Sequence, residues 1–346
     1  MRDLLQRLSD AHGISGHEGS VRAIVEQELA PYGDLRVDTP GNLIFTKKGA
    51  SPTIMLAAHL DEIGLAVKHI DDEGFLRFVK VGGWFDQTLL NQRVIVHSKN
   101  PCAGVIGSKP PHVMREEEKK KPVDAKDMFI DVGASSADEA ADMGIEVGTA
   151  ISIDRNLVLL ANDRITGKAL DDRAGVALLI EAMKRISESD IEPTVHAVFT
   201  VQEEVGLKGA KTSAFGLNPD VAIALDVCVS GDHPGINKTE SAMAVGKGAV
   251  ITVMDAGGRG VITHPTVLTW LRKTADENKI AYQLDVSDGG TTDATAISLT
   301  REGIPSGVLS MATRYIHSPV EVLSLEDMRS CTDLIVHAVG MAGKWF

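Results

Sequence analysis

The sequence predicts an α/β fold: a mainly parallel sheet sandwiched by helices, with a small, β-rich, barrel-like domain inserted into it. At both ends of the chain, short apolar runs alternate with helical segments, which is typical of a parallel sheet covered on both sides. The middle of the chain instead contains short β-like runs joined by Gly- and Asp-rich turns. The 346 residues are also long for a single domain. We therefore expect one larger domain, formed by residues 1–63 and 164–346, and an inserted domain formed by residues 64–163.

Two helices and a buried strand are predicted before the insertion. The first helix ends near Gly13, and the second begins after Ser20, a favourable N-cap residue. Apolar residues recur at helical spacing in both helices: Leu4, Leu5, Leu8, Val21, Ile24, Val25 and Leu29. The strand over residues 54–58 is apolar throughout, as expected for a strand buried on both faces of a sheet, and it ends at His59.

The inserted segment is predicted to be built from short strands. They are Leu65–Ile70, Phe75–Val79, Arg93–His97, Ala103–Ile106, Met128–Val132 and Thr149–Ile153. One short helix fits Ser136–Met143. A mixed charge run covers residues 115–121. A solvated loop is the simpler interpretation of this run, and a contact between subunits is the alternative.

After residue 164 the sequence returns to helices that alternate with apolar strands. The predicted strands are Val195–Val201, Val221–Leu225, Val250–Met254 and Ser306–Met311. The predicted helices are Val176–Ile186, His264 to about Asn278, Thr292–Arg301, and a last helix capped by Ser324. This order favours a mainly parallel sheet, because each helix can return the chain to the start of the next strand.

Composition excludes several classes of function. The formal net charge of −13 argues against nucleic-acid binding, which needs a basic surface. No stretch has the length of a membrane span, and the first residues do not resemble a signal peptide, so we expect no membrane partner and a cytoplasmic location. Cys102, Cys228 and Cys331 are far apart and indicate free thiols. Cys228 is expected to be buried in packing, although its place two residues after Asp226 also allows a position near a site.

Side chains that can bind metal ions follow four of the predicted strands. They are His59 and Asp61 after the strand at 54–58, Glu203 and Glu204 after 195–201, Asp226 after 221–225, and His317 beyond 306–311. Because ligands bind outside the carboxyl ends of the strands in open α/β sheets, these side chains are expected to share one cavity. Two histidines among several carboxylates favour a hydrolytic site that holds two divalent ions.

The first motifs also have simpler interpretations. His59-x-Asp61 fits a metal ligand and the carboxylate that orients it, but it also fits a core histidine at a strand end. Asp171 and Asp172 open a helix, so one of them could simply cap that helix. In the functional interpretation, one carboxylate bridges two ions and its neighbour is held by Arg173 or by backbone groups.

Glu203 and Glu204 fit a pair in which one residue binds metal and the other accepts a proton from a metal-bound water. The simpler interpretation is a solvated acidic pair. Two glycine-rich segments, 257–260 and 289–294, match neither a P-loop nor a dinucleotide-binding motif. Tight turns are favoured for both, although the second opens a helix and its N–H groups could hold a substrate carboxylate or carbonyl.

Motifs along nearly the whole chain resemble one family. They are AAHLDEIG at 57–64, GGWFDQTLLNQRV at 82–94, GVIGSKPPH at 104–112, GKALDDRAG at 167–175, VQEEVGLKGA at 201–210, ALDV at 224–227, GGTTDA at 289–294 and IHSPVE at 316–321. The chain resembles the tetrahedral (TET) dodecameric aminopeptidases of the glutamyl-aminopeptidase and "cellulase M"-like group, which are clan MH di-metal exopeptidases. The motifs at 82–112 separate this group from other di-metal exopeptidases.

The resemblance implies a role for each candidate residue. His59 and Asp226 would hold one divalent ion, Glu204 and His317 would hold the other, and Asp171 would bridge them. The peptide bond between Asp171 and Asp172 would be cis, Glu203 would be the general base, and Asp61 would orient His59. Each subunit would therefore bind two ions, zinc or cobalt, since both accept mixed histidine and carboxylate ligands.

The resemblance also implies a reaction and an assembly. A metal-bridging water would lose its proton to Glu203 and attack the scissile carbonyl of a short peptide with a free N-terminus. The inserted domain, residues 64–163, would mediate dimerisation, and dimers would form a hollow tetrahedral dodecamer.

Three alternatives remain at this point: another di-metal amide hydrolase, such as a deacylase or carboxypeptidase; a scaffold without activity; and a glycanase. The adjacent positions of Glu203 and Glu204 disfavour the glycanase. The preferred N-terminal residue is open, and Arg259 would favour an acidic one if it lay in the pocket.

Overall fold

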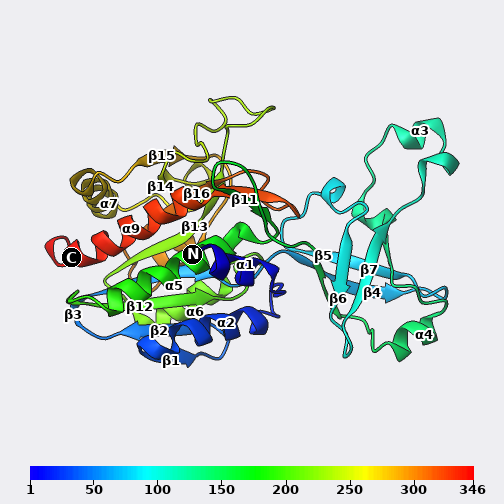
Figure 1. Cartoon of the computed structure of the whole chain (residues 1–346), viewed down its shortest axis with the longest axis horizontal. Coiled ribbons are helices and arrows are strands. Elements are labelled where there is room, and N and C mark those ends of the chain that lie inside the picture. Colours follow the sequence, from blue (N-terminus) through cyan, green and yellow to red (C-terminus); the bar gives the residue numbers. More distant parts are fainter.

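The computed structural model describes residues 1–346 and contains a large sheet covered by helices and a small closed barrel beside it (Figure 1). The sheet has eight strands, in the spatial order β1 (Asp34–Val37), β2 (Leu43–Lys47), β12 (Pro193–Thr200), β3 (Ala50–His59), β13 (Val221–Val229), β16 (Ser306–Thr313), β14 (Ala249–Met254) and β15 (Tyr282–Val286). The predicted fold class is therefore confirmed.

The four central strands of the sheet, β12, β3, β13 and β16, run parallel to one another. The sheet is mixed at its margins, because β1, β2 and β14 each run antiparallel to an inward neighbour. Thr200 at the end of β12 lies beside His59 at the end of β3. The carboxyl ends of the four parallel strands therefore meet at one edge, where the candidate site residues were expected.

Helices cover both faces of the sheet. One face packs against α1 (Arg2–Asp10), α2 (Gly19–Leu29), α5 (Leu170–Ser187), α7 (Pro265–Asn278) and α9 (Leu325–Met341). The other face packs against α6 (Lys208–Leu217) and α8 (Asp293–Ser298). Strand β3 shows the two-sided burial directly: Leu56 belongs to the first core, and its neighbours Met55 and Ala57 belong to the second. Alternating side chains of an apolar strand point to opposite faces, so a strand buried on both sides is apolar throughout.

The inserted segment closes into a six-stranded barrel at one end of the molecule (Figure 1). Its strands are β4 (Gly64–Ile70), β5 (Leu76–Val81), β6 (Arg93–Val96), β7 (Cys102–Gly107), β8 (Phe129–Asp131) and β9 (Ala150–Ile153), so each of the six predicted runs forms a strand. The barrel has its own core of 15 buried apolar residues. Ser136 caps α4 (Ala137–Asp142), close to the predicted short helix. In the charge run, α3 (Glu116–Lys119) is an exposed turn of helix whose Glu118 pairs with Lys109 at 3.0 Å.

Several predicted boundaries are wrong. Helix α2 begins at Gly19 with Glu18 at its N-cap, so Ser20 lies inside the helix and does not cap it. The Glu18 side chain accepts the N–H groups of Gly16 and Gln202. Strand β13 continues to Val229 beside β16, so Asp226 lies inside the strand and not after it. The helix predicted at Thr292–Arg301 is shorter, since α8 ends at Ser298.

The sequence interpretation missed seven short or marginal elements. They are β1, β2, β15, α6, and the three-stranded sheet β10 (Val158–Leu159), β11 (Arg164–Gly167) and β17 (Glu321–Ser324). No helix of the chain has both the length and the apolar character that a membrane span needs.

Candidate metal centre

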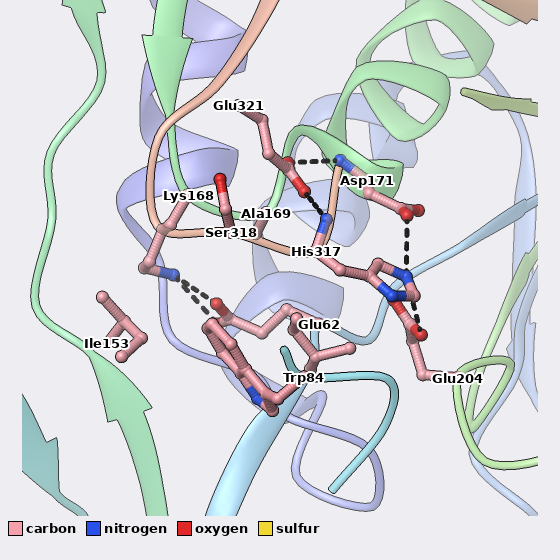
Figure 2. Close-up of a pocket in the computed structure, with 11 residues that line it drawn as sticks. Glu62, Trp84, Ile153, Lys168, Ala169, Asp171, Glu204, His317, Ser318 and Glu321 are labelled. Atoms are coloured by element: carbon pink, nitrogen blue, oxygen red, sulfur yellow. Dashed lines mark hydrogen bonds and ion pairs between the residues drawn. The ribbon is translucent and has the colours of Figure 1, made fainter. Parts of the chain in front are cut away.

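Two histidines from distant parts of the chain meet on the carboxylate of Asp171. His59 Nε2 lies 3.1 Å from Asp171 Oδ1, and His317 Nε2 lies 3.3 Å from Asp171 Oδ2. The same His317 Nε2 atom also lies 3.4 Å from Glu204 Oε2 (Figure 2). Asp171 therefore stands between two halves of a cluster, with one histidine on each of its oxygen atoms.

A second group of potential ligand atoms surrounds His59. Its ring nitrogen and one oxygen each from Asp172 and Asp226 lie within 4.8 Å of one another, as do ligand atoms of His59, Asp171 and Glu204. The oxygen atoms of Asp172, however, already accept N–H groups from His59 at 3.2 Å and from Gly175 at 3.0 Å. Backbone groups, and not Arg173, therefore hold Asp172, and Asp171 is the carboxylate that faces both histidines.

Glu203 and Asp61 lie against the same cluster. Glu203 is buried, with Oε2 at 3.9 Å from His59 Nε2. Asp61 Oδ1 is 3.5 Å from His59 Nδ1, which also lies 3.1 Å from the Asp61 carbonyl oxygen. The Asp61 carboxylate in addition accepts the N–H groups of Glu203 at 3.0 Å and Glu204 at 3.2 Å. Asp61 thus positions the backbone of the glutamate pair as well as the ring of His59.

The cluster carries more acidic groups than its histidines can balance. Burial raises the pKa of Glu203 well above its ordinary value, and the charges of Asp226 and Asp293 add to the rise. Burial and the charge of Asp171 likewise raise the pKa values of Asp226 and Glu204. Such groups are costly to ionise unless a cation lies among them.

The pKa values of the two histidines are raised as well, by the neighbouring carboxylates and against the effect of burial. Burial opposes a charge on His317, but its hydrogen bonds to Asp171 and Glu204 raise its pKa to about 11. Burial also opposes a charge on His59, yet Glu203 and Asp171 raise its pKa well above the ordinary value. The acidic surroundings of both rings are thus strongly negative, which favours the binding of cations among these side chains.

The donor atoms fit divalent ions of the zinc and cobalt type. Histidine nitrogen and carboxylate oxygen are ligands that these ions accept together. One carboxylate oxygen, Oε1 of Glu204, is buried and has no hydrogen-bond partner. An orphaned acceptor of this kind is costly in a folded protein unless a ligand or ion satisfies it.

The backbone adopts unusual conformations where it presents these side chains. Ala169, Gln202 and His317 have left-handed φ angles of 55°, 55° and 59°, although none of them is glycine. Each lies at or within two residues of a candidate ligand. The Asp171–Asp172 peptide bond is cis, as the family resemblance implied. Left-handed residues other than glycine each cost on the order of 1–3 kcal/mol and concentrate at functional sites.

Two groups that hold the ligands were not identified from the sequence as site residues. The buried carboxylate of Glu321 accepts the N–H of Asp171 at 3.0 Å and that of His317 at 2.9 Å, so it fixes two ligand-bearing segments (Figure 2). The carbonyl oxygen of Gly83, in the barrel segment, lies 3.0 Å from His317 Nδ1. Both residues fall in motifs that carried the family resemblance, which is the only sequence signal that could have indicated them.

A buried ionic group joins two of the segments that carry candidate ligands. Lys168 Nζ lies 2.9 and 2.8 Å from the two carboxylate oxygens of Glu62 (Figure 2) and 2.9 Å from the carbonyl of Ala11. Arg173 lies 3.5 Å from Glu62 and donates to the Leu8 carbonyl at 2.6 Å. Burial alone would raise the pKa of Glu62, but Lys168 and Arg173 hold it below its usual value. This group ties the segment after β3 to the start of α5.

The cluster opens into a cavity of about 710 Å³. His59, Asp171, Glu203 and Asp226 form part of its wall. Cys228 is half-buried: it packs against a small apolar cluster and also lines the cavity, so the packing role and the position near the site both hold. The turn at 289–292 lines the cavity too, whereas Arg259 is exposed and does not.

A parallel sheet with histidines and carboxylates at its carboxyl edge, joined to a small barrel, is the fold of the di-metal exopeptidases. Within this class the chain belongs to the M42 glutamyl aminopeptidase family, whose model matches residues 41–334. It is 43% identical to an aminopeptidase of the archaeon Desulfurococcus kamchatkensis, with a TM-score of 0.94 over 99% of this chain and 95% of that chain.

Two further relatives are a lysyl aminopeptidase and a TET1 peptidase. The lysyl aminopeptidase of Pyrococcus furiosus is 36% identical over 94% of this chain and 93% of its own length. The TET1 peptidase of Pyrococcus horikoshii, which can assemble into a tetrahedron or a large octahedral shell, is 35% identical, with a TM-score of 0.89 over 97% of this chain and 98% of that chain. One structure of a TET1 peptidase holds a dodecamer. The chain is therefore a hydrolase that acts on peptide bonds, with the aminopeptidase function of its family.

Proposed function

We propose that the chain is a metal-dependent aminopeptidase that releases N-terminal residues from short peptides. The observation that carries the proposal is the position of Asp171 between His59 and His317, with Glu204 beside the second histidine. Two adjoining sets of ligand atoms that share one carboxylate suit two divalent ions. Membership in the M42 family supports the same chemistry.

In this proposal His59 and Asp226 hold one ion, Glu204 and His317 hold the other, and Asp171 belongs to both. Zinc and cobalt are the ions that this ligand set suits. When bound, the pair of ions would acidify a water molecule and stabilise negative charge on the scissile carbonyl oxygen.

Glu203 is the proposed general base. Its buried carboxylate accepts the proton of the attacking water and then transfers it to the amine of the leaving peptide. The Asp61 carboxylate keeps Glu203 and Glu204 in place through their N–H groups, which leaves both glutamate side chains free for the reaction. Asp61 is therefore proposed as a positioning residue.

Replacement of Glu203 by glutamine tests this assignment. The amide keeps the size of the side chain but cannot accept the proton, so turnover of an aminoacyl p-nitroanilide should fall by about 10²- to 10⁴-fold. Metal content, measured by elemental analysis of the purified protein, should not change. Glu188→Gln, at an exposed position after α5, is the matched control and should keep full activity. Unchanged turnover in Glu203→Gln would remove Glu203 from the mechanism.

We further propose that residues 1–63 and 164–346 form the catalytic domain and that residues 64–163 serve dimerisation. The separate core of the barrel supports this division. The dodecamer known for the TET1 relative supports assembly of such dimers into a tetrahedral dodecamer. Peptides of limited length with a free N-terminus are the substrates that this arrangement would admit.

A further inference from the structure

A second group of carboxylates lines the cavity away from the metal centre. Asp255 follows β14, Asp285 lies on β15, and Asp288 and Glu240 complete the group, which we call the acidic wall. No lysine or arginine lines the cavity. The acidic wall therefore presents negative charge alone to any molecule that fills the space beside the catalytic cluster.

Two members of the acidic wall are buried and lack a cationic partner. Asp255 is 4% exposed and Asp285 is 8% exposed. Asp255 Oδ1 accepts the Val261 N–H at 2.6 Å, but its Oδ2 atom is buried with no hydrogen-bond partner. Burial raises the pKa of both carboxyls, and the charge of Asp285 adds to the rise at Asp255. Buried carboxylates without a partner are costly, and a cationic ligand would remove that cost.

The sheet fixes how far the acidic wall lies from the reacting bond. Asp226 on β13 pairs with Ser310 on β16, which pairs with Val250 on β14, and β15 lies beside β14. The residue of β15 level with Asp226 is Gln283, and Asp285 lies two residues further along that strand. Asp285 is thus about 14 Å from Asp226 across the sheet and about 7 Å along it. Lysine and arginine carry their charge farther from the backbone than any other residue, so among N-terminal residues their side chains come nearest to covering this separation.

We propose that the acidic wall binds the cationic side chain of an N-terminal lysine or arginine, so that the enzyme prefers basic residues and disfavours acidic ones. The proposal rests on the aminopeptidase function proposed above, because it assumes that the scissile bond lies at the Asp171 cluster. A glutamate side chain in the same space would face Asp255, Asp285 and Asp288 without a counter-charge, and like charges at short range repel.

A chromogenic substrate panel tests the proposal on the metal-loaded full-length protein. L-lysine, L-arginine, L-leucine and L-glutamate p-nitroanilides are compared by kcat/KM. The lysine and arginine substrates should exceed leucine by at least about ten-fold, the usual effect of a charged hydrogen bond. Glutamate should be the poorest substrate. Equal values for lysine and leucine in the wild-type protein would overturn the proposal, whatever the variants do.

Two variants test which carboxylates cause the preference for basic N-terminal residues. Asp285→Asn should lower kcat/KM for lysine by at least about ten-fold and leave leucine within about two-fold, since only the charged side chain needs the carboxylate. Asp255→Asn, which keeps an acceptor for Val261, should act in the same direction. Asp276→Asn, on the exposed face of α7, is the charge-matched control.

The outcomes separate this proposal from the proposed function. If Asp285→Asn weakens the lysine and leucine substrates equally, the carboxylate binds the α-amino group or supports the fold, and the side-chain proposal is wrong. If the wild-type protein cleaves none of the four substrates, the aminopeptidase assignment itself fails. If it cleaves all of them without preference, the aminopeptidase assignment stands and the acidic wall has no role in selection.

Discussion

At the scale of single residues, Gly83 shows how tightly the candidate metal centre is enclosed. A Cβ atom at this position would lie 2.6 Å from His317 Nδ1, closer than real Cβ atoms approach another heavy atom. Gly83→Ala should therefore push the His317 ring away from Glu204 and Asp171. Displacing the support of a metal ligand costs about 10- to 100-fold in metal affinity or activity.

Titration of the metal-free protein with zinc, followed by calorimetry, measures the effect of Gly83→Ala. One of two sites should weaken by about ten-fold or more while the other is retained. Gly19→Ala is the control, because no atom lies within 4 Å of the added methyl group there. Equal zinc affinity in Gly83→Ala and the wild type would show that the ring has room to move.

Most candidate ligands could be predicted from the sequence, because the carboxyl ends of parallel strands meet at one edge of the sheet. His59, Glu203, Glu204 and Asp226 each lie at or near the carboxyl end of a parallel strand, and the structure brings them together. Glu321 was not foreseeable in the same way. Its carboxylate accepts backbone N–H groups, and a residue that holds main chain leaves no pattern of spacing in a single sequence. The role of Asp61 toward the glutamate pair escaped notice for the same reason.

At the scale of elements, the ionic group of Glu62, Lys168 and Arg173 joins the end of β3 to the start of α5. Lys168→Met should lower the free energy of unfolding by about 3 kcal/mol, because it leaves a buried carboxylate with Arg173 alone. Urea denaturation followed by circular dichroism gives the value. Adding Glu62→Gln removes the stranded charge but keeps an acceptor for Gly13 N–H, so the double variant should recover at least half of the loss. A single-variant cost below about 1 kcal/mol would contradict this view of the group.

Long buried elements were predictable, and short marginal ones were not. Strand β3 and helix α9 bury apolar residues in regular repeats, which a sequence displays directly. Strand β1 is exposed along most of its length, and β10 contains only two residues, so neither shows a periodic pattern. The parallel core could be inferred from helix and strand alternation, but the antiparallel pairing of β14 with β16 depends on tertiary packing.

At the scale of the whole molecule, exposed apolar residues mark a surface at β10, a strand of the three-stranded sheet, and just after it. Val158, Leu159 and Leu160 are consecutive and 54%, 50% and 41% exposed. In the proposed dodecamer such residues are expected to be covered by another subunit. Leu159→Asp should therefore shift the native mass from twelve times the 36.9 kDa subunit to a smaller species.

Light scattering during gel filtration measures the native mass of the Leu159→Asp variant. Val37→Asp is the matched control, since Val37 is 47% exposed on the edge strand β1 of the large sheet. It should leave the dodecamer intact. A dodecamer in both variants would place the subunit contacts elsewhere on the surface.

The carbonyl of Gly83 has a consequence for any attempt to rebuild this protein from parts. Gly83 belongs to the inserted segment, yet its carbonyl oxygen accepts the hydrogen bond that orients the ring of His317, which lies 234 positions later in the sequence. A trimmed version without residues 64–163 would lose that bond along with the barrel. A chimaera carrying a relative's barrel would work only if the graft kept the Gly82-Gly83-Trp84 junction in register. If the barrel serves dimerisation as proposed, its outer surface can change without loss of the site, while this junction must stay fixed.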